Sequence, residues 1–127
     1  MLLQIEPQSD EPIYLQLRNQ IVQALVRGEL KEGDALPSVR RLAVDLGINL
    51  HTVNKAYQLL ESQGYLHIYG RRGARITAPL APTGDYVDQL ASDLKKLYIE
   101  AQSHGVDRRM FEQTVKAMLA KEAENAH

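Results

Sequence analysis

Apolar residues recur every three or four positions through the first part of the chain, and this spacing predicts amphipathic helices. Residues 2–6 come before the first helix and are expected to form a short extended arm. The first helix is expected between Pro12 and Gly28, because proline suits the first helical turn and glycine suits the residue after the last. Its buried stripe is predicted to be Ile13, Leu17, Ile21 and Leu25.

Two shorter helices around a tight turn are predicted within residues 36–60. The earlier one runs roughly from Val39 to Asp45, is capped by Ser38 or a neighbour, and ends at Gly47. The later one follows Asn49, which has the right chemistry for a helix cap. Their apolar positions are Val39, Leu42, Ala43 and Leu46 in the earlier helix, and Val53, Ala56, Tyr57 and Leu60 in the later one.

The later helix also has a polar face. At about 100° per residue, the side opposite its apolar stripe carries His51, Asn54, Lys55 and Gln58. A helix with one apolar stripe and one face of hydrogen-bonding side chains is what reading the major groove of DNA requires. The two helices and their turn therefore predict a helix-turn-helix.

After residue 64 the pattern changes to strand-like alternation. Residues 65–69 are β-prone, residues 70–73 (Gly-Arg-Arg-Gly) suit a hairpin tip, and residues 74–77 are expected to form the returning strand. A helix-turn-helix followed by a basic-tipped hairpin is a winged helix. Arg71 and Arg72 are then in position to contact the DNA backbone or minor groove. The alternative is a solvated turn whose charges serve solubility.

The last third of the chain predicts two further amphipathic helices after a linker at residues 79–84. The first, of about 18 residues, has its apolar positions at Val87, Leu90, Leu94, Leu97 and Ala101. After a break at residues 103–106, Asp107 is expected to cap a last helix bearing Met110, Phe111, Val115, Met118 and Leu119. Two such helices cannot bury their apolar faces alone. The continuous seam favours a homodimer, with packing inside one chain as the alternative.

These elements predict a mainly α fold. It consists of a winged helix-turn-helix (three helices plus a β-hairpin wing) followed by two C-terminal helices. The expected organisation is a DNA-binding domain at residues 1–78, the linker at residues 79–84 and a dimerisation tail at residues 85–127.

Composition adds limits to this interpretation. The chain has 127 residues, no cysteine, no apolar run long enough for a membrane span and no signal-peptide pattern, so we expect a cytoplasmic protein without membrane contact. Its net charge of -1 gives no overall sign of nucleic-acid binding. Residues 36–80 nevertheless hold six basic side chains against two acidic ones, whereas residues 81–127 hold six against eight. Positive charge on the middle segment suits phosphate binding, although chance could also produce it.

Catalytic and metal-binding patterns are not found in the sequence. There is no phosphate-binding loop, no nucleophile paired with a base and no carboxylate pair in an apolar setting, so we expect no enzymatic activity. His67, His104 and His127 are scattered and have no neighbouring ligand pattern, so no metal and no cofactor are predicted.

Several separated motifs together resemble the N-terminal domain of the GntR family of transcription regulators. They are Pro12-Ile13-Tyr14, residues 33–43 (Gly-Asp-Ala-Leu-Pro-Ser-Val-Arg-Arg-Leu-Ala), residues 47–57, residues 60–64 and the glycine-arginine wing. The resemblance covers about residues 10 to 78. The larger effector-binding or aminotransferase-like domains of other members would need far more chain. A tail of two helices is similar to the short YtrA-like subfamily, in which it serves mainly for dimerisation.

The resemblance implies particular DNA contacts. It places Arg40 against DNA, Ser38 at a phosphate-facing cap, and Arg71, Arg72 and Gly73 in the wing. The start of the recognition helix supplies further candidates, and the full expected set is Ser38, Arg40, Arg41, Asn49, Leu50, His51, Thr52, Asn54, Lys55, Arg71, Arg72 and Gly73. Arg41 has the alternative of only solvating its helix. Leu50 departs from the family, which commonly has arginine there, and it could instead touch a thymine methyl group.

The expected function is that of a homodimeric DNA-binding regulator, a repressor of a nearby operon that the resemblance suggests encodes an ABC-type transporter. Its partners would be a palindromic double-stranded operator and a second copy of the chain; the effector is unknown. The expected dimerisation residues are Val87, Leu90, Leu94, Leu97, Phe111, Val115 and Met118. Two alternatives are a regulator with a small-molecule site between tail and winged helix, and a winged-helix module that binds protein.

Overall fold

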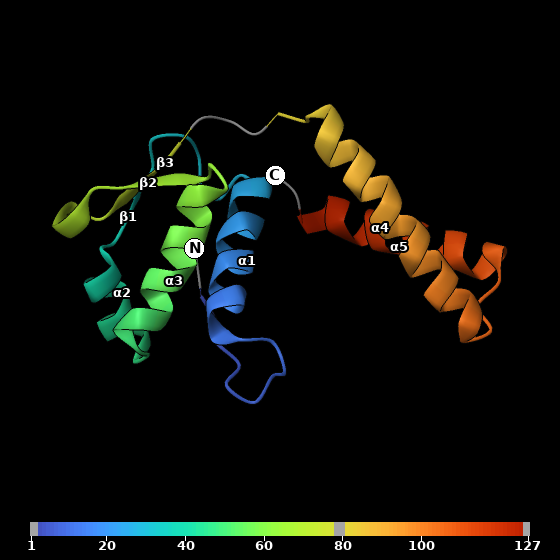
Figure 1. The fold of residues 1–127 in the computed structure, drawn as a ribbon, viewed down its shortest axis with the longest axis horizontal. Helices are drawn as coiled ribbons and strands as arrows, with labels where there is room; N and C mark the ends of the chain where they lie inside the picture. Colours follow the sequence, from blue (N-terminus) through green and yellow to red (C-terminus); the bar gives the residue numbers. More distant parts are fainter. Residues whose placement is uncertain (1–2, 78–80, 126–127) are drawn as a thin grey trace. The chain divides into compact units, whose positions relative to one another are not determined.

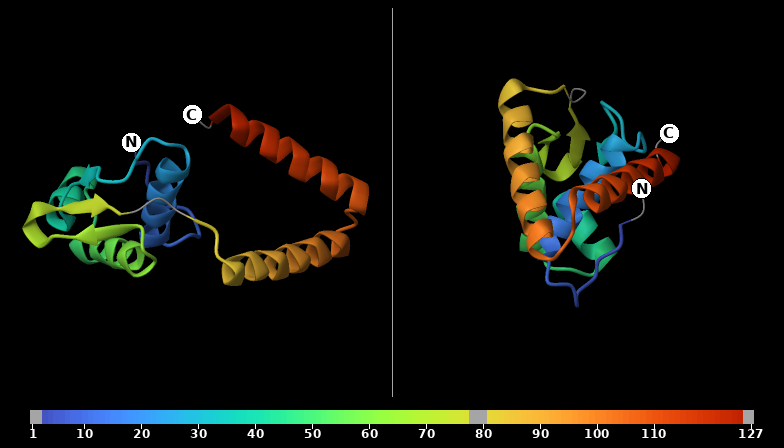
Figure 2. Two further views of the ribbon diagram at one scale, coloured as in Figure 1. Left: turned by 90° about the horizontal axis from the view of Figure 1, so that it is seen from above. Right: turned by 90° about the vertical axis from the view of Figure 1, so that its right-hand side faces the viewer.

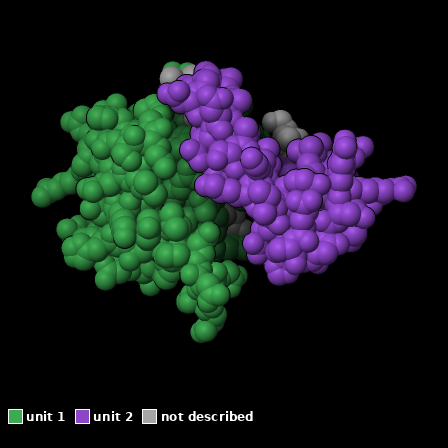
Figure 3. All heavy atoms as spheres, turned by 45° about the vertical axis from the view of Figure 1, so that its right-hand side comes forward, with its two compact units in different colours: residues 1–80, 127 green, residues 81–126 purple. Residues whose placement is uncertain are grey.

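The computed structural model describes residues 3–77 and 81–125, and within them five α-helices and three short strands occur (Figure 1). Their order is α1 (Ile13–Val26), β1 (Ala35–Leu36), α2 (Val39–Leu46), α3 (Leu50–Ser62), β2 (Leu66–Ile68), β3 (Ala74–Ile76), α4 (Gly84–Ser103) and α5 (Arg108–Asn125). The chain divides into two compact units, residues 1–80 and residues 81–126 (Figure 3). Residues 79 and 80 of the predicted linker lie outside the described residues, and its last residue, Gly84, begins α4.

The core of the first unit is formed where α1 and α2 pack against α3. The predicted stripe of α3 is confirmed, since Val53, Ala56, Tyr57 and Leu60 are all buried. In α1, Leu17 and Ile21 are buried but Ile13 and Leu25 only half-buried, and Ala24 takes a core position instead. A strict four-residue spacing turns by about 40° per step around a helix, so both ends of such a stripe leave the buried face.

The predicted helix ends are confirmed around the helix-turn-helix. The Ser38 hydroxyl caps α2 by accepting from the backbone N–H of Arg41 at 3.1 Å, and the Asn49 carboxamide caps α3 by accepting from that of His51 at 2.7 Å. Gly47, between the helices, has a φ of 67°, which glycine adopts without steric cost. The turn is therefore set by local side-chain chemistry.

The wing is an antiparallel hairpin of β2 and β3 whose tip is a single 3₁₀ turn, Gly70–Arg72. The sequence did not predict β1, which adds a third strand on the other side of β3, with Leu36 opposite Ala74. This pairing connects the segment that enters α2 directly to strand β3 of the wing. A two-residue strand has no periodicity of its own, so only the long-range pairing defines it.

The N-terminal arm is held by two glutamine side chains of α1. The Gln16 carboxamide accepts from the backbone N–H of Glu6 at 2.8 Å and donates to the carbonyls of Glu6 and Glu11 at 3.0 and 2.9 Å. One turn later, Gln20 makes the same reciprocal pair with the backbone of Gln4. One helical turn and two extended residues span similar lengths of about 5 to 7 Å, so the two pairs fit together. Gln16 is buried and each of its polar atoms has a partner, as burial requires.

The second unit is a helical hairpin of α4 and α5. The Asp107 carboxylate accepts from the backbone N–H of Met110 at 2.9 Å, which confirms the predicted cap. The rings of Tyr98 and Phe111 meet near the turn with centroids 4.9 Å apart, and the helices diverge from there (Figure 2). Neither helix has a buried residue among those described. Of the predicted dimerisation residues, Phe111 and Val115 are half-buried; those that remain exposed are Val87, Leu90, Leu94, Leu97 and Met118.

Candidate nucleic-acid interface

A groove of about 650 Å³ lies between the start of α2, the start of α3 and the wing tip. Residues of all three elements line it, namely Ser38, Val39, Arg40, Leu50, Asn54, Ile68, Gly70 and Arg71. Five of these were predicted DNA contacts from segments far apart in the sequence. The fold thus joins the cap of α2, the recognition helix and the wing in one continuous surface, which we call the DNA-facing groove.

Arg40 and Leu50 also line a second, smaller groove of about 300 Å³, together with Ala43, Val44, Gly47 and Ile48. Both residues therefore lie on the ridge between the two grooves. Leu50 is 36% exposed and Val44, which lines the smaller groove, is 74% exposed, so apolar surface extends from this ridge into the smaller groove. Apolar side chains at such a place suit contact with a thymine methyl group rather than with phosphate.

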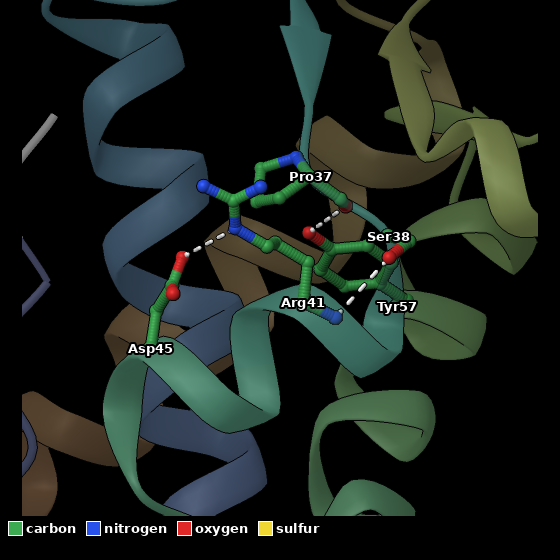
Figure 4. Close-up of polar contacts among 5 residues, drawn as sticks. All are labelled: Pro37, Ser38, Arg41, Asp45 and Tyr57. Carbon is green, nitrogen blue, oxygen red and sulfur yellow. Dashed lines mark hydrogen bonds and ion pairs between the residues drawn. The ribbon is translucent and has the colours of Figure 1, made fainter.

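Arg40 and Arg41 differ in their partners although they are neighbours on α2. The Arg41 guanidinium lies 3.4 Å from the Asp45 carboxylate, one turn along the helix (Figure 4). Within the part of the chain that the structure describes, Arg40 has no carboxylate partner, and its exposed side chain lines both grooves. Arg40 is therefore available to an external anion, whereas the charge of Arg41 is already partly balanced.

The recognition helix α3 presents side chains of different availability. Asn49, Leu50, His51 and Lys55 are exposed, and Thr52 and Asn54 are half-buried. Asn49 uses its carboxamide oxygen for the cap, so only its amide N–H groups remain for another partner. Asn54 lines the DNA-facing groove with both its donor and acceptor atoms free of protein hydrogen bonds among the described residues.

Tyr57 of α3 fixes the backbone that leads into α2 from the core side. Its side chain is fully buried in the core, and its hydroxyl donates to the Pro37 carbonyl at 2.8 Å (Figure 4). Burial raises the pKa of the Tyr57 hydroxyl well above its usual range, so it remains a neutral donor at any physiological pH. The interpretation of Tyr57 as a core residue is confirmed, and the hydrogen bond fixes the backbone just before the Ser38 cap.

The wing exposes Arg71 and Arg72 but buries Gly73. Gly73 has φ 90° and ψ -147°, and a Cβ placed there would lie 2.3 Å from the Leu36 carbonyl oxygen. The absence of a side chain at Gly73 thus allows the wing to approach the backbone of residues 36–38. Near the same end of the hairpin, the Glu61 carboxylate accepts from the backbone N–H of Ile68, the last residue of β2, at 2.8 Å and joins β2 to α3.

Sequence reasoning missed several residues of this surface. Val39 and Ile68 line the DNA-facing groove, yet their apolar character indicated only core packing. Val44 lines the smaller groove, because α2 is short and the Val44 side chain is open to solvent. No sequence signal separates these apolar residues from those of the core, because their exposure depends on how α2 and the wing meet.

No group of three or more His, Asp or Glu side chains in the described part of the chain is arranged to hold a metal ion. No helix among the described residues is both long and apolar enough to cross a membrane.

Residues 13–76 match the family described as bacterial regulatory proteins, gntR family. The chain belongs to the GntR family. It is 35% identical over 121 residues to the HTH-type transcriptional repressor YtrA of Bacillus subtilis, covering 94% of this chain and 93% of that protein. The predicted similarity to YtrA-like members is confirmed. GntR regulators bind DNA through this winged helix-turn-helix, and the protein is accordingly a DNA-binding transcription regulator and not an enzyme.

Solved structures share the GntR fold. YtrA from Sulfolobus acidocaldarius, a GntR-family transcription factor, is 33% identical with a TM-score of 0.66, covering 78% of this chain and 99% of that one. A protein described as a transcriptional antiterminator from Listeria monocytogenes EGD-e is 27% identical with a TM-score of 0.82, covering 93% of this chain and 90% of that one. The second match extends over nearly the whole chain, so the two-helix tail as well as the winged helix has a structural counterpart.

Proposed function

We propose that this GntR regulator is a homodimeric repressor that binds a palindromic operator. The two recognition helices would enter successive major grooves about one helical turn apart, with the wings alongside. The observation that carries this proposal is the DNA-facing groove, which unites a free arginine of α2, an unpaired carboxamide of α3 and an arginine of the wing. These are the three kinds of contact that phosphate binding, base reading and groove-edge binding require.

Within this surface we assign phosphate contacts to Arg40, Arg71, Arg72 and the capped start of α2. Arginine is always charged and makes paired hydrogen bonds to phosphate. The α2 N-terminus adds backbone N–H groups and a partial positive charge. Base contacts are assigned to Asn54 and His51, which lie in the first two turns of α3, where recognition helices usually touch base edges. Leu50 would add contact with a thymine methyl group.

The polar character of α3 supports DNA as the partner. A protein-binding winged helix would be expected to present an apolar face. The cap residue Asn49 and the α3 residues His51, Lys55 and Gln58 are instead exposed polar side chains, and Leu50 is the exposed apolar residue of α3. The second unit supports the homodimer, because its apolar seam is exposed along the length of α4. A dimer binds two operator half-sites more tightly than a monomer binds one, because the second winged helix is held at a high effective concentration once the first has bound.

The role as a repressor and the identity of the regulated genes are inferred from relatives. The Bacillus relative is named as a repressor, and it covers nearly the whole of this chain. The resemblance to YtrA-like members supports an operon for an ABC-type transporter as the regulated genes. Selection of bound sequences from random DNA, followed by a search for the selected site near transporter genes, tests both parts. Selected sites without two-fold symmetry would contradict the dimeric operator.

Replacing Arg40 with alanine is expected to weaken binding to the selected operator and to random DNA alike, by about 10- to 100-fold. The reason is the loss of one charge-assisted phosphate contact, which should also reduce the slope of log affinity against log salt by about 0.9. Gel shifts or fluorescence anisotropy across a salt series measure both quantities. Arg41→Ala is the matched control, since Arg41 is paired with Asp45, and an equal loss in both variants would contradict the assignment.

Replacing Asn54 with alanine is expected to change which operator is selected while leaving affinity for random DNA nearly unchanged. A lost base contact should reduce discrimination at one base pair of each half-site by about 1–3 kcal/mol. Parallel selections with wild type and variant identify that base pair. Gln58→Ala, one turn further along α3 and outside the DNA-facing groove, is expected to return the wild-type site. An unchanged site from the Asn54 variant would remove Asn54 from base reading.

A further inference from the structure

A lysine of the recognition helix rests on an aromatic ring of α1. The Lys55 ammonium lies 4.0 Å from the centroid of the Tyr14 ring, well within the range of a cation–π interaction. Tyr14 is the second residue of α1 and is half-buried, with its ring packed against the core. The ring is therefore held by the fold, whereas Lys55 is exposed and its side chain is long and flexible.

Asn54 and Lys55 are consecutive residues of α3 but face different elements. Asn54 lines the DNA-facing groove beside the wing. Lys55, about 100° further around the helix, contacts α1 instead. No carboxylate of residues 3–77 forms an ion pair with Lys55, so the ring is what holds its charge on this side. The positive charge of Lys55 thus lies on the α1 side of α3, and not in the DNA-facing groove beside the wing.

A cation over a ring face still has N–H groups directed away from the ring, and these can donate to an anion. Ordering a long side chain opposes binding, so a lysine already held in place binds a phosphate at lower entropic cost than a free one. The Tyr14 ring is itself uncharged and offers the ammonium no competing anion. The contact consequently orders Lys55 without neutralising it.

We propose that Tyr14 is a positioning residue of the DNA interface, whose ring holds the Lys55 ammonium on the α1 side of the recognition helix for a backbone phosphate. This inference rests on the proposed DNA-facing surface and extends it beyond the groove. Lys55 then contributes affinity independent of base sequence, and Tyr14 acts only through Lys55.

A double-mutant cycle tests the assignment, with the duplex selected by the wild type and a random-sequence duplex as probes. Tyr14→Leu is expected to weaken binding to both probes by about two- to five-fold, and Tyr14→Phe, which keeps the ring, to stay close to wild type. Lys55→Ala is expected to reduce the salt slope by about 0.9. In the Lys55→Ala background, Tyr14→Leu should have no further effect. Equal effects of Tyr14→Leu in both backgrounds, or none in the wild-type background, would overturn the assignment.

A measurement on the free protein separates this inference from the proposed function. The ring should shift the Lys55 side-chain CH₂ proton resonances upfield, and the shift should disappear in Tyr14→Leu and remain in Tyr14→Phe. Absence of the shift in the wild type would overturn the inference without bearing on DNA binding. A wild type that shows the shift but no salt-dependent DNA binding would overturn the proposed function, and the role of Tyr14 with it.

Discussion

Replacing Leu94 with aspartate should convert the protein to a monomer and weaken binding to the selected operator by about 100-fold or more. Leu94 is 47% exposed in the middle of the α4 seam, between Leu90 and Leu97, so a charge there would be buried without a partner in the proposed dimer. Binding of a single half-site would remain, because nothing in the winged helix changes. Light scattering measures the mass in solution, and gel shifts with full and half operators measure the affinities.

Ile99→Asp provides the matched control for this experiment. Ile99 is 54% exposed on the same helix, but at 100° per residue it lies nearly opposite the seam. It should therefore leave both mass and affinity close to those of the wild type. A dimer that survives the Leu94 substitution, or a wild type that is monomeric at the concentrations where it binds operator, would contradict the proposed role of the seam.

Replacing Gly73 with alanine should cost the winged helix about 3–4 kcal/mol in free energy of unfolding. Its φ of 90° and ψ of -147° lie in a region that only glycine adopts readily. The added Cβ would also lie 2.3 Å from the Leu36 carbonyl oxygen and 3.2 Å from the Pro37 carbonyl carbon, both of which are backbone atoms. Relief would require the wing to move away from the strand that leads into α2. Urea unfolding at equilibrium measures the loss.

Gly70→Ala is the control for the effect of backbone conformation alone. Gly70 also has a positive φ, of 63°, but a Cβ there meets no atom within 4 Å. Gly70→Ala should lower the free energy of unfolding by about 1–2 kcal/mol. If Gly73→Ala is no more destabilising than Gly70→Ala, the close approach to Leu36 does not contribute to stability.

The Gly73 contact also matters for the DNA-facing groove. The segment before α2 is held on one side by Gly73 and on the other by the Tyr57 hydroxyl, which binds the Pro37 carbonyl. Ser38 and Arg40 follow directly, so their positions depend on both contacts. Loss of either contact should therefore reduce DNA affinity as well as stability, because a misplaced cap and arginine no longer face the phosphates together with the wing.

The sequence by itself determined the helices, their ends and the polar face of α3. Ser38, Asn49 and Asp107 cap the helices that follow them, because capping needs only a short polar side chain and the next two or three N–H groups. The arginine-bearing hairpin tip and the stripe of α3 also follow from local chemistry and periodicity. These features depend on residues within one or two turns of each other.

Only the tertiary structure decided which of these residues act together. It added β1, distinguished free Arg40 from paired Arg41, and placed Lys55 on Tyr14. Each of these facts depends on elements separated by many residues or on the rotamer that a long side chain adopts. The physical reason is that helical periodicity specifies which face is buried, whereas the neighbours of an exposed charged side chain depend on how complete elements pack.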